Sequence, residues 1–151
     1  MKAYGEALVR LAWVYVDNAA DHDDLLQDIL VALWRALPRF RAEASERTFV
    51  LRVAHNRGIT FASRRRIHDS LEDHAGIADS RPGPDEELDR ASRQARLIAA
   101  VRTLPPVLRE AVMLRLEGCS VPEIAAVLNV TENNVSVRLS RARGRLRELL
   151  A

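Results

Sequence analysis

Two groups of residues in this sequence have the side-chain types that catalysis or metal binding would require. His22, Asp23 and Asp24 follow one another, and Cys119 could pair with His55 as nucleophile and base. Adjacent residues on a helix point in different directions, however, and no third ligand lies at a suitable spacing. We therefore expect no catalytic residues, no metal site and no cofactor. We expect His22 to lie in a loop at a helix start and Cys119, the single cysteine, to be a small, partly buried filler.

The most specific pattern lies between residues 120 and 150, where the sequence predicts a helix-turn-helix. Ser120 and Glu123 form a capping box, and Pro122 falls in the first turn of the helix, where its missing amide proton does no harm. Asn129 can adopt the left-handed conformation of a tight turn, and Thr131 can cap the second helix. The buried stripe of that second helix is predicted to comprise Val135, Leu139, Ala142 and Leu146.

The opposite face of the second helix carries side chains that suit the major groove of DNA. Arginine can bond guanine or straddle phosphates, serine and asparagine can bond base edges, and an outward valine can touch a thymine methyl group. The alternative interpretation is an arginine-rich helix end that is soluble and compatible with the helix dipole. The candidate DNA contacts on and beside this face are Asn133, Asn134, Ser136, Val137, Arg138, Ser140, Arg141 and Arg143.

The elements that must position these residues are expected to be helices throughout. Apolar residues recur at three- and four-residue spacing and strand signals are nearly absent, so the sequence predicts an all-α protein. Further helices are expected at residues 3 to 17, from Asp23 or Asp24 to Leu37, and at 46 to 65. The second of these has an outward face that is either a solvated surface or an interface and comprises Asp24, Gln27, Asp28, Val31 and Arg35. The outward side of the third carries Arg52, His55, Asn56 and Ser63 and ends in Arg64, Arg65 and Arg66, which suit a helix dipole or a phosphate-binding patch.

Charge divides the chain into two domains and a linker. The 151 residues have a formal charge of only +2, but residues 41 to 66 hold 7 basic and 2 acidic residues, whereas residues 67 to 95 hold 3 basic and 8 acidic ones. We expect domains at residues 1–66 and 96–151, joined by a flexible acidic linker at 67–95. Each domain is near the lower size limit for an independent core, so the two are expected to dock on each other or on a partner. No membrane-spanning stretch or secretory signal is recognised, which favours a cytoplasmic protein.

These segments resemble one protein family. LPPVLREAVMLRLEGCSVPEIAAVLNVTENNVSVRLSRARGRLRELL is similar to domain four of the extracytoplasmic-function subfamily of bacterial sigma factors, the initiation subunits of RNA polymerase. DLLQDILVALWRALPRFR resembles the region that docks on the clamp helices of the polymerase β′ subunit, and FVLRVAHNRGITFASRRR resembles the promoter-melting region. The resemblance implies an alternative sigma factor whose partners are core polymerase, through β′ and β, promoter DNA and an anti-sigma factor.

The same resemblance assigns roles to residues. The outward face of the second helix, Asp24 to Arg35, would bind the β′ clamp helices. The segment from Phe40 to Ser45 would hold a flipped base of the minus-ten element, and the recognition helix would bind the minus-35 element. The full set of residues implied to contact the minus-ten element is Phe40, Arg41, Ser45, Arg52, His55, Asn56, Arg64, Arg65 and Arg66. A transcriptional regulator that binds duplex DNA without being a polymerase subunit is the alternative hypothesis; an enzyme is not expected.

Overall fold

The computed structural model describes residues 2–42, 45–69 and 87–151, and over these residues the chain is folded into helices joined by turns. The N-terminal half, residues 2–69, contains α1 (Lys2–Ala12), α2 (Ala19–Ala36), a short 3-10 helix η1 (Leu37–Arg39) and α3 (Glu46–Asp69). The C-terminal half, residues 87–151, contains α4 (Glu87–Thr103), α5 (Pro106–Leu116), α6 (Val121–Leu128) and α7 (Glu132–Leu150). The predicted all-α fold is confirmed.

The first two helices differ from the predicted ones because an earlier residue caps α2. Asn18 has an extended backbone, and its side chain accepts a hydrogen bond from the backbone N–H of Asp21 at 2.8 Å. An asparagine in this position satisfies one of the free N–H groups of the first turn, so the helix begins at Ala19 rather than at Asp23 or Asp24. Helix α1 ends at Ala12 instead of residue 17, and a run of turns follows it.

His22 therefore lies inside α2 rather than in a loop, and it is buried. Its ring stacks on Trp13 with 4.1 Å between centroids, and Nε2 lies 2.7 Å from the carbonyl oxygen of Val9. The guanidinium of Arg102 lies over the Trp13 ring, 4.9 Å from the ring centroid. His22 thus joins α2 to α1 and to the turn that follows α1.

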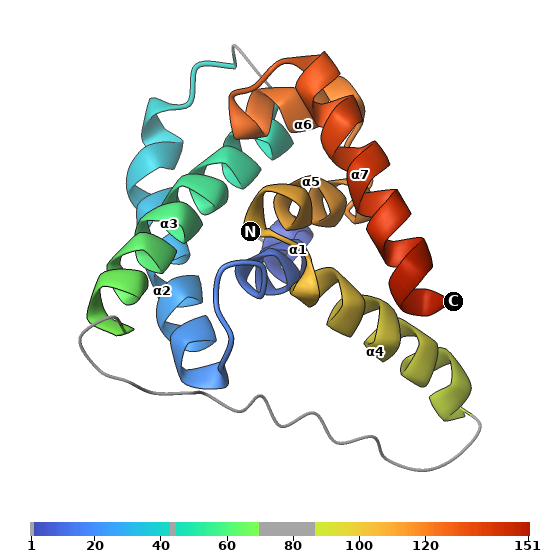
Figure 1. The fold of residues 1–151 in the computed structure, drawn as a ribbon. Coiled ribbons are helices and arrows are strands. Elements are labelled where there is room, and N and C mark those ends of the chain that lie inside the picture. Colours follow the sequence, from blue (N-terminus) through green and yellow to red (C-terminus); the bar gives the residue numbers. More distant parts are fainter. Residues whose placement is uncertain (1, 43–44, 70–86) are drawn as a thin grey trace.

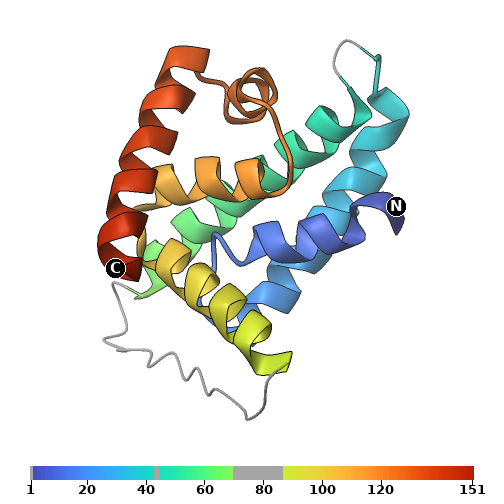
Figure 2. The ribbon, with the colours of Figure 1, turned by 90° about the vertical axis from the view of Figure 1, so that its right-hand side faces the viewer.

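The two halves pack against each other around one hydrophobic core. Leu8 and Leu11 of α1, Val50 of α3, Leu114 of α5 and Ile124 of α6 are all buried in a single cluster. Figures 1 and 2 show α1 and α5 side by side in the middle of the molecule; α3 begins beside α6 and packs on α1, and α7 packs on α5. Docking of the halves on each other, one of the two expected arrangements, is the one present in this structure.

A close approach between α3 and the turn after α1 requires glycine. A Cβ atom on Gly58 would lie 2.3 Å from Cδ2 of the Tyr15 ring, far inside contact distance. The glycine that weakens α3 as an isolated helix therefore lets the ring of Tyr15 pack directly on its backbone.

The segment predicted to be a linker is only partly described. Helix α3 continues to Asp69 and α4 begins at Glu87, so both ends of the range 67–95 are helical. Residues 70–86, the middle of the segment predicted to be a flexible linker, lie outside the described residues. Among the helices that the structure describes, none is long and apolar enough to cross a membrane.

Candidate nucleic-acid interface

The helix-turn-helix is built by the caps that the sequence predicts. Ser120 accepts a hydrogen bond from the N–H of Glu123, whose side chain accepts one from the N–H of Ser120, so the capping box is complete. Asn129 ends α6 with a left-handed backbone (φ 56°), and Thr131 caps α7 by accepting a hydrogen bond from Asn134 at 3.1 Å. With both ends fixed, the short α6 and the long α7 are held across each other.

Helix α7 turns one apolar stripe inward and leaves its polar face open. Val135 and Ala142 are fully buried, and Leu139 and Leu146 pack on the core at its edge. The predicted DNA-facing side chains are exposed with one exception, and Val137 among them is 40% exposed. The exposed ones are Asn133, Asn134, Ser136, Val137, Ser140, Arg141 and Arg143.

The exception is Arg138, which turns towards the N-terminal half. Its side chain is only 18% exposed and lies 3.9 Å from the carboxylate of Glu110 on α5. Burial raises the pKa of Glu110 to about 6, although Arg138 and Arg109 oppose that shift. A half-buried ion pair of this kind competes with any phosphate or base for the same guanidinium.

His55 is the clearest departure from the predicted minus-ten surface. It is 4% exposed, and its Nδ1 lies 2.7 Å from the hydroxyl of Tyr15. Burial, and then the positive charge of Arg138, lowers the pKa of His55 to about 4, so the ring is neutral at pH 7. The helical wheel placed His55 outward because it could not include the turn after α1, whose Tyr15 packs against that side of α3. His55 is a buried structural residue in this conformation and not an exposed DNA contact.

The remaining residues of α3 that were predicted to contact the minus-ten element divide into exposed ones and ones paired within the protein. Asn56 and Arg64 are exposed, whereas Arg65 donates to both carboxylate oxygens of Asp21, the shortest contact being 2.5 Å. This contact is the main reason why the pKa of Asp21 is lowered. Arg52 donates through Nε and Nη2 to the carbonyl oxygen of Ala126 in α6, at 3.1 and 2.8 Å. The side chain of Arg66 lies outside the described residues.

The loop before α3 places Phe40 and Ser45, two of the residues predicted to contact the minus-ten element, at the N-terminal end of that helix. The Phe40 ring lies 5.0 Å from the ring of Phe49 and is half-buried, and Arg41 is exposed. Ser45 caps α3, because its hydroxyl accepts a hydrogen bond from the N–H of Thr48 at 3.1 Å. Residues 43 and 44 between them are not described.

The outward face of α2 is mostly exposed and contains a residue that sequence reasoning missed. Asp24, Gln27, Val31 and Arg35 are exposed, and Asp28 is held by a bidentate pair with Arg57 at 2.9 and 3.0 Å. Trp34 is 83% exposed, one turn after Val31, which is 43% exposed. The available signal was the position of Trp34 outside the apolar stripe of Leu25, Ile29 and Leu33, which is buried. Exposed tryptophan beside apolar and polar side chains is typical of a protein interface.

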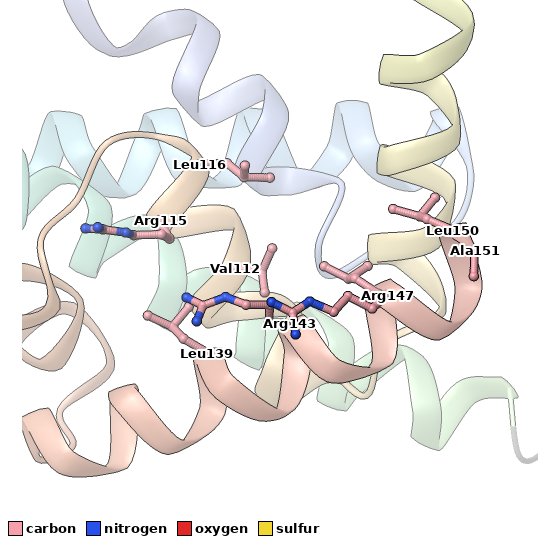
Figure 3. A pocket seen from close by; sticks show the side chains of 9 residues that line it. Val112, Arg115, Leu116, Leu139, Arg143, Arg147, Leu150 and Ala151 are labelled. Carbon is pink, nitrogen blue, oxygen red and sulfur yellow. The ribbon is translucent and has the colours of Figure 1, made fainter.

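A groove between α5 and α7 forms a second apolar surface (Figure 3). It encloses about 460 Å³, and Val112, Leu116, Leu139 and Leu150 contribute apolar side chains to its walls. Its rim is basic and consists of Arg115, Arg143 and Arg147. An apolar floor with cationic edges suits an amphipathic segment that carries carboxylates.

The described residues offer no alternative site for metal chemistry. No group of three or more His, Cys, Asp or Glu side chains among them is placed to hold a metal ion. Cys119 is buried, and burial raises the pKa of its thiol, which disfavours the reactive thiolate.

Comparison with known proteins relates both halves to one family. Residues 1–67 match the family model for sigma-70 region 2, and residues 94–146 match the one for sigma-70, region 4. The chain is 31% identical to the RNA polymerase sigma factor CnrH of Cupriavidus metallidurans, over 97% of this chain and 82% of that protein. It is 32% identical to the ECF RNA polymerase sigma factor SigM of Mycobacterium tuberculosis, over 95% of this chain and 71% of that protein.

Solved structures give the same relationship. CnrH in complex with the cytosolic domain of CnrY is 28% identical, with a TM-score of 0.68 over 99% of this chain and 83% of that chain. The sigma factor RpoE of Bartonella quintana, solved with the anti-sigma factor NepR, shares the fold with a TM-score of 0.82 over 99% of this chain and 92% of that one. The present chain belongs to the extracytoplasmic-function subfamily of the sigma-70 family of RNA polymerase sigma factors.

Proposed function

We propose that this sigma factor binds core RNA polymerase and directs it to specific promoters by contacting the minus-35 element with α7 and the minus-ten element with α3 and the loop before it. The observation that carries this proposal is the open polar face of α7, seven candidate DNA-contacting residues of which are exposed on a capped, rigid helix. A helix presented in this way fits the major groove, which distinguishes all four base pairs.

Within α7, position decides the role of each side chain. Ser136, Val137, Ser140 and Arg141 lie on the face opposite the buried stripe and would contact base edges. Arg143 lies nearer the edge and would contact phosphates, which fix the register without specifying sequence. Arg138 would join them only after it leaves Glu110.

In the N-terminal half, Arg41, Asn56 and Arg64 are the exposed candidates for holding single-stranded DNA of the minus-ten element. Phosphate contacts combined with a pocket for an unstacked base are the usual way in which single strands are held. Arg52 and Arg65 would contribute after exchanging their present partners for phosphate. His55 would act indirectly, by fixing α3 against Tyr15.

Two surfaces are available for protein partners. The face of α2 that ends in Val31 and Trp34 would bind the clamp helices of β′, because its exposed apolar side chains are ringed by Asp24, Gln27 and Arg35. The groove between α5 and α7 would receive a segment of the β subunit. An anti-sigma factor, as found with the related proteins in their complexes, would compete for these surfaces. The site of action would be the cytoplasm, and the polymerase would supply all the catalysis.

A reconstituted run-off transcription assay tests the proposal. Core polymerase with the purified chain should produce promoter-specific RNA, and core polymerase alone should not. Trp34→Ala should lower the affinity for core polymerase by about 10-fold or more, the effect of removing an interface hot spot, without loss of helix content. Specific duplex binding by the isolated chain, with no gain from core polymerase, would instead support the regulator hypothesis.

A further inference from the structure

In addition to the shared hydrophobic core, four arginines join the two halves by donating to backbone carbonyl groups of the opposite half. From α3, Arg47 donates to the carbonyl of Glu117 and Arg52 to that of Ala126. In the other direction, Arg102 donates to the carbonyls of Val16 and Asp17 at 3.4 and 3.3 Å, and Arg109 donates to that of Val14 at 2.6 Å. We call these four arginines and their acceptors the carbonyl latch.

Two of the five acceptors are carbonyl groups at the C-terminal end of a helix, and the other three lie in the turns between α1 and α2. Ala126 lies in the last turn of α6, and Glu117 directly follows α5. The last four carbonyls of a helix have no partner inside it and carry the negative end of the helix dipole. A guanidinium from the other half therefore acts as a C-terminal cap, and its planar fork suits one oxygen approached by two N–H groups, as Arg52 does at Ala126.

One arginine of the latch is a residue that the proposed function needs for DNA, and a second candidate DNA contact lies outside the latch but is also paired. Arg52 belongs to the predicted minus-ten surface, yet its guanidinium caps the first helix of the helix-turn-helix. Arg138 belongs to the predicted minus-35 surface, yet it lies beside Glu110, near the buried His55 and Tyr15. Thus one candidate DNA contact from each half, Arg52 and Arg138, has a partner within the protein.

Size gives a second, independent argument. A compact chain of 151 residues has a radius of gyration of about 15 Å and is therefore roughly 40 Å across. Two promoter elements centred about 25 base pairs apart are separated by roughly 85 Å of B-DNA, at about 3.4 Å per base pair. The latched arrangement cannot reach both elements at once.

We infer that the carbonyl latch holds the free protein in a closed conformation without the help of any partner, and that Arg52 must exchange the Ala126 carbonyl for DNA phosphate when the halves separate. The inference rests on the proposed function for its biological meaning, but closure itself is a property of the free chain. If so, one movement of the Arg52 side chain both releases α6 and allows α3 to bind DNA.

The experiment uses the single native cysteine as a reporter of opening. Cys119 is 1% exposed, and its thiol interacts with the Arg47 side chain across the interface. The rate at which a thiol reagent modifies Cys119 is compared among the wild type, the double variant Arg52→Ala/Arg102→Ala and the control Arg57→Ala. The control removes an arginine of the same helix whose bidentate partner, Asp28, lies in its own half.

We expect the double variant to be modified at least about 10-fold faster than the wild type, since charge-assisted hydrogen bonds typically shift an equilibrium by this factor or more. The control should stay within about twofold of the wild type, the difference expected where no bond between the halves is lost. Small-angle scattering should give a radius of gyration near 15 Å for the wild type and a larger one for the double variant, with unchanged helix content by circular dichroism. Equal modification rates in all three proteins, or a wild type that is already extended, would overturn the latch.

Failure of the proposed function gives a different result. A double variant that opens as expected but directs no promoter-specific RNA synthesis by core polymerase, together with a wild type that is equally inactive, would refute the sigma activity and leave the latch supported. A wild type that is active but extended when free would refute the latch alone.

Discussion

Replacing Glu110 with glutamine should make the stability of this protein more sensitive to acid. Glu110 and His55 lie in the same buried contact between the halves, together with Tyr15 and Arg138, and their titrations oppose each other. Burial lowers the pKa of His55 from 6.5 to about 4 and raises the pKa of Glu110 from 4.5 to about 6. Both side chains are well shielded from solvent, His55 being 4% and the Glu110 side chain 12% exposed.

The sign of each contribution follows from proton linkage. The depressed pKa of His55 means that its neutral form adds stability above pH 6.5, and this stability is lost as the pH falls towards 4. The raised pKa of Glu110 means that protonation favours the folded protein, so stability is gained as the pH falls from 6 to 4.5. Between pH 7.5 and 5.5, linkage gives a loss of roughly 1 to 2 kcal/mol from His55 and a gain of about 1 kcal/mol from Glu110. The wild type should therefore lose less than about 1 kcal/mol through this pair.

Urea denaturation followed by circular dichroism at pH 7.5 and 5.5 measures the difference. Glu110→Gln removes only the gain, so its free energy of unfolding should fall by about 1 kcal/mol more than that of the wild type over this interval. His55→Gln removes only the loss, so its acid sensitivity should be smaller than that of the wild type. Because each variant is compared with itself at two pH values, any pH-independent loss of packing cancels. Identical pH dependence in all three proteins would refute the assignment of these buried titrations.

Substitutions at four further positions have defined outcomes. Gly58→Ala should lower the free energy of unfolding by about 1 to 3 kcal/mol, because the new Cβ atom would collide with Tyr15. Gly144→Ala should raise the free energy of unfolding by up to about 1 kcal/mol, because nothing lies within 4 Å of the added Cβ atom and alanine favours the helix. Urea titration measures both changes. Asn129→Ala should cost about 1 kcal/mol because of the left-handed backbone, and Asn129→Gly should not. Arg141→Ala should cost about 1 to 3 kcal/mol at one promoter position in binding assays with holoenzyme, and an equal loss on every promoter would mark a phosphate contact.

The recognition helix illustrates what local sequence can determine. Ser120, Asn129 and Thr131 act through hydrogen bonds and backbone conformations confined to a few neighbouring residues, so their types and spacing were enough to predict both caps and the turn. The buried stripe of α7 followed from helical periodicity alone. Asn18 shows the limit of such reasoning. Asp23 and Asp24 are equally suitable N-cap residues by type, so the sequence alone did not show that Asn18, earlier in the chain, caps α2.

What the sequence by itself determined is the helical class, the helix-turn-helix and the residues of α7 that face away from its core, because each depends on interactions along a single helix. Only the tertiary structure decided that His55 is buried, that Arg138 pairs with Glu110 and that Arg52 caps α6. These contacts join residues from 28 to 74 positions apart. A helical wheel includes one helix alone, so it cannot show which side another segment covers. The same arginines that suit phosphate also suit a free carbonyl, and the packing of the two halves selects the carbonyl.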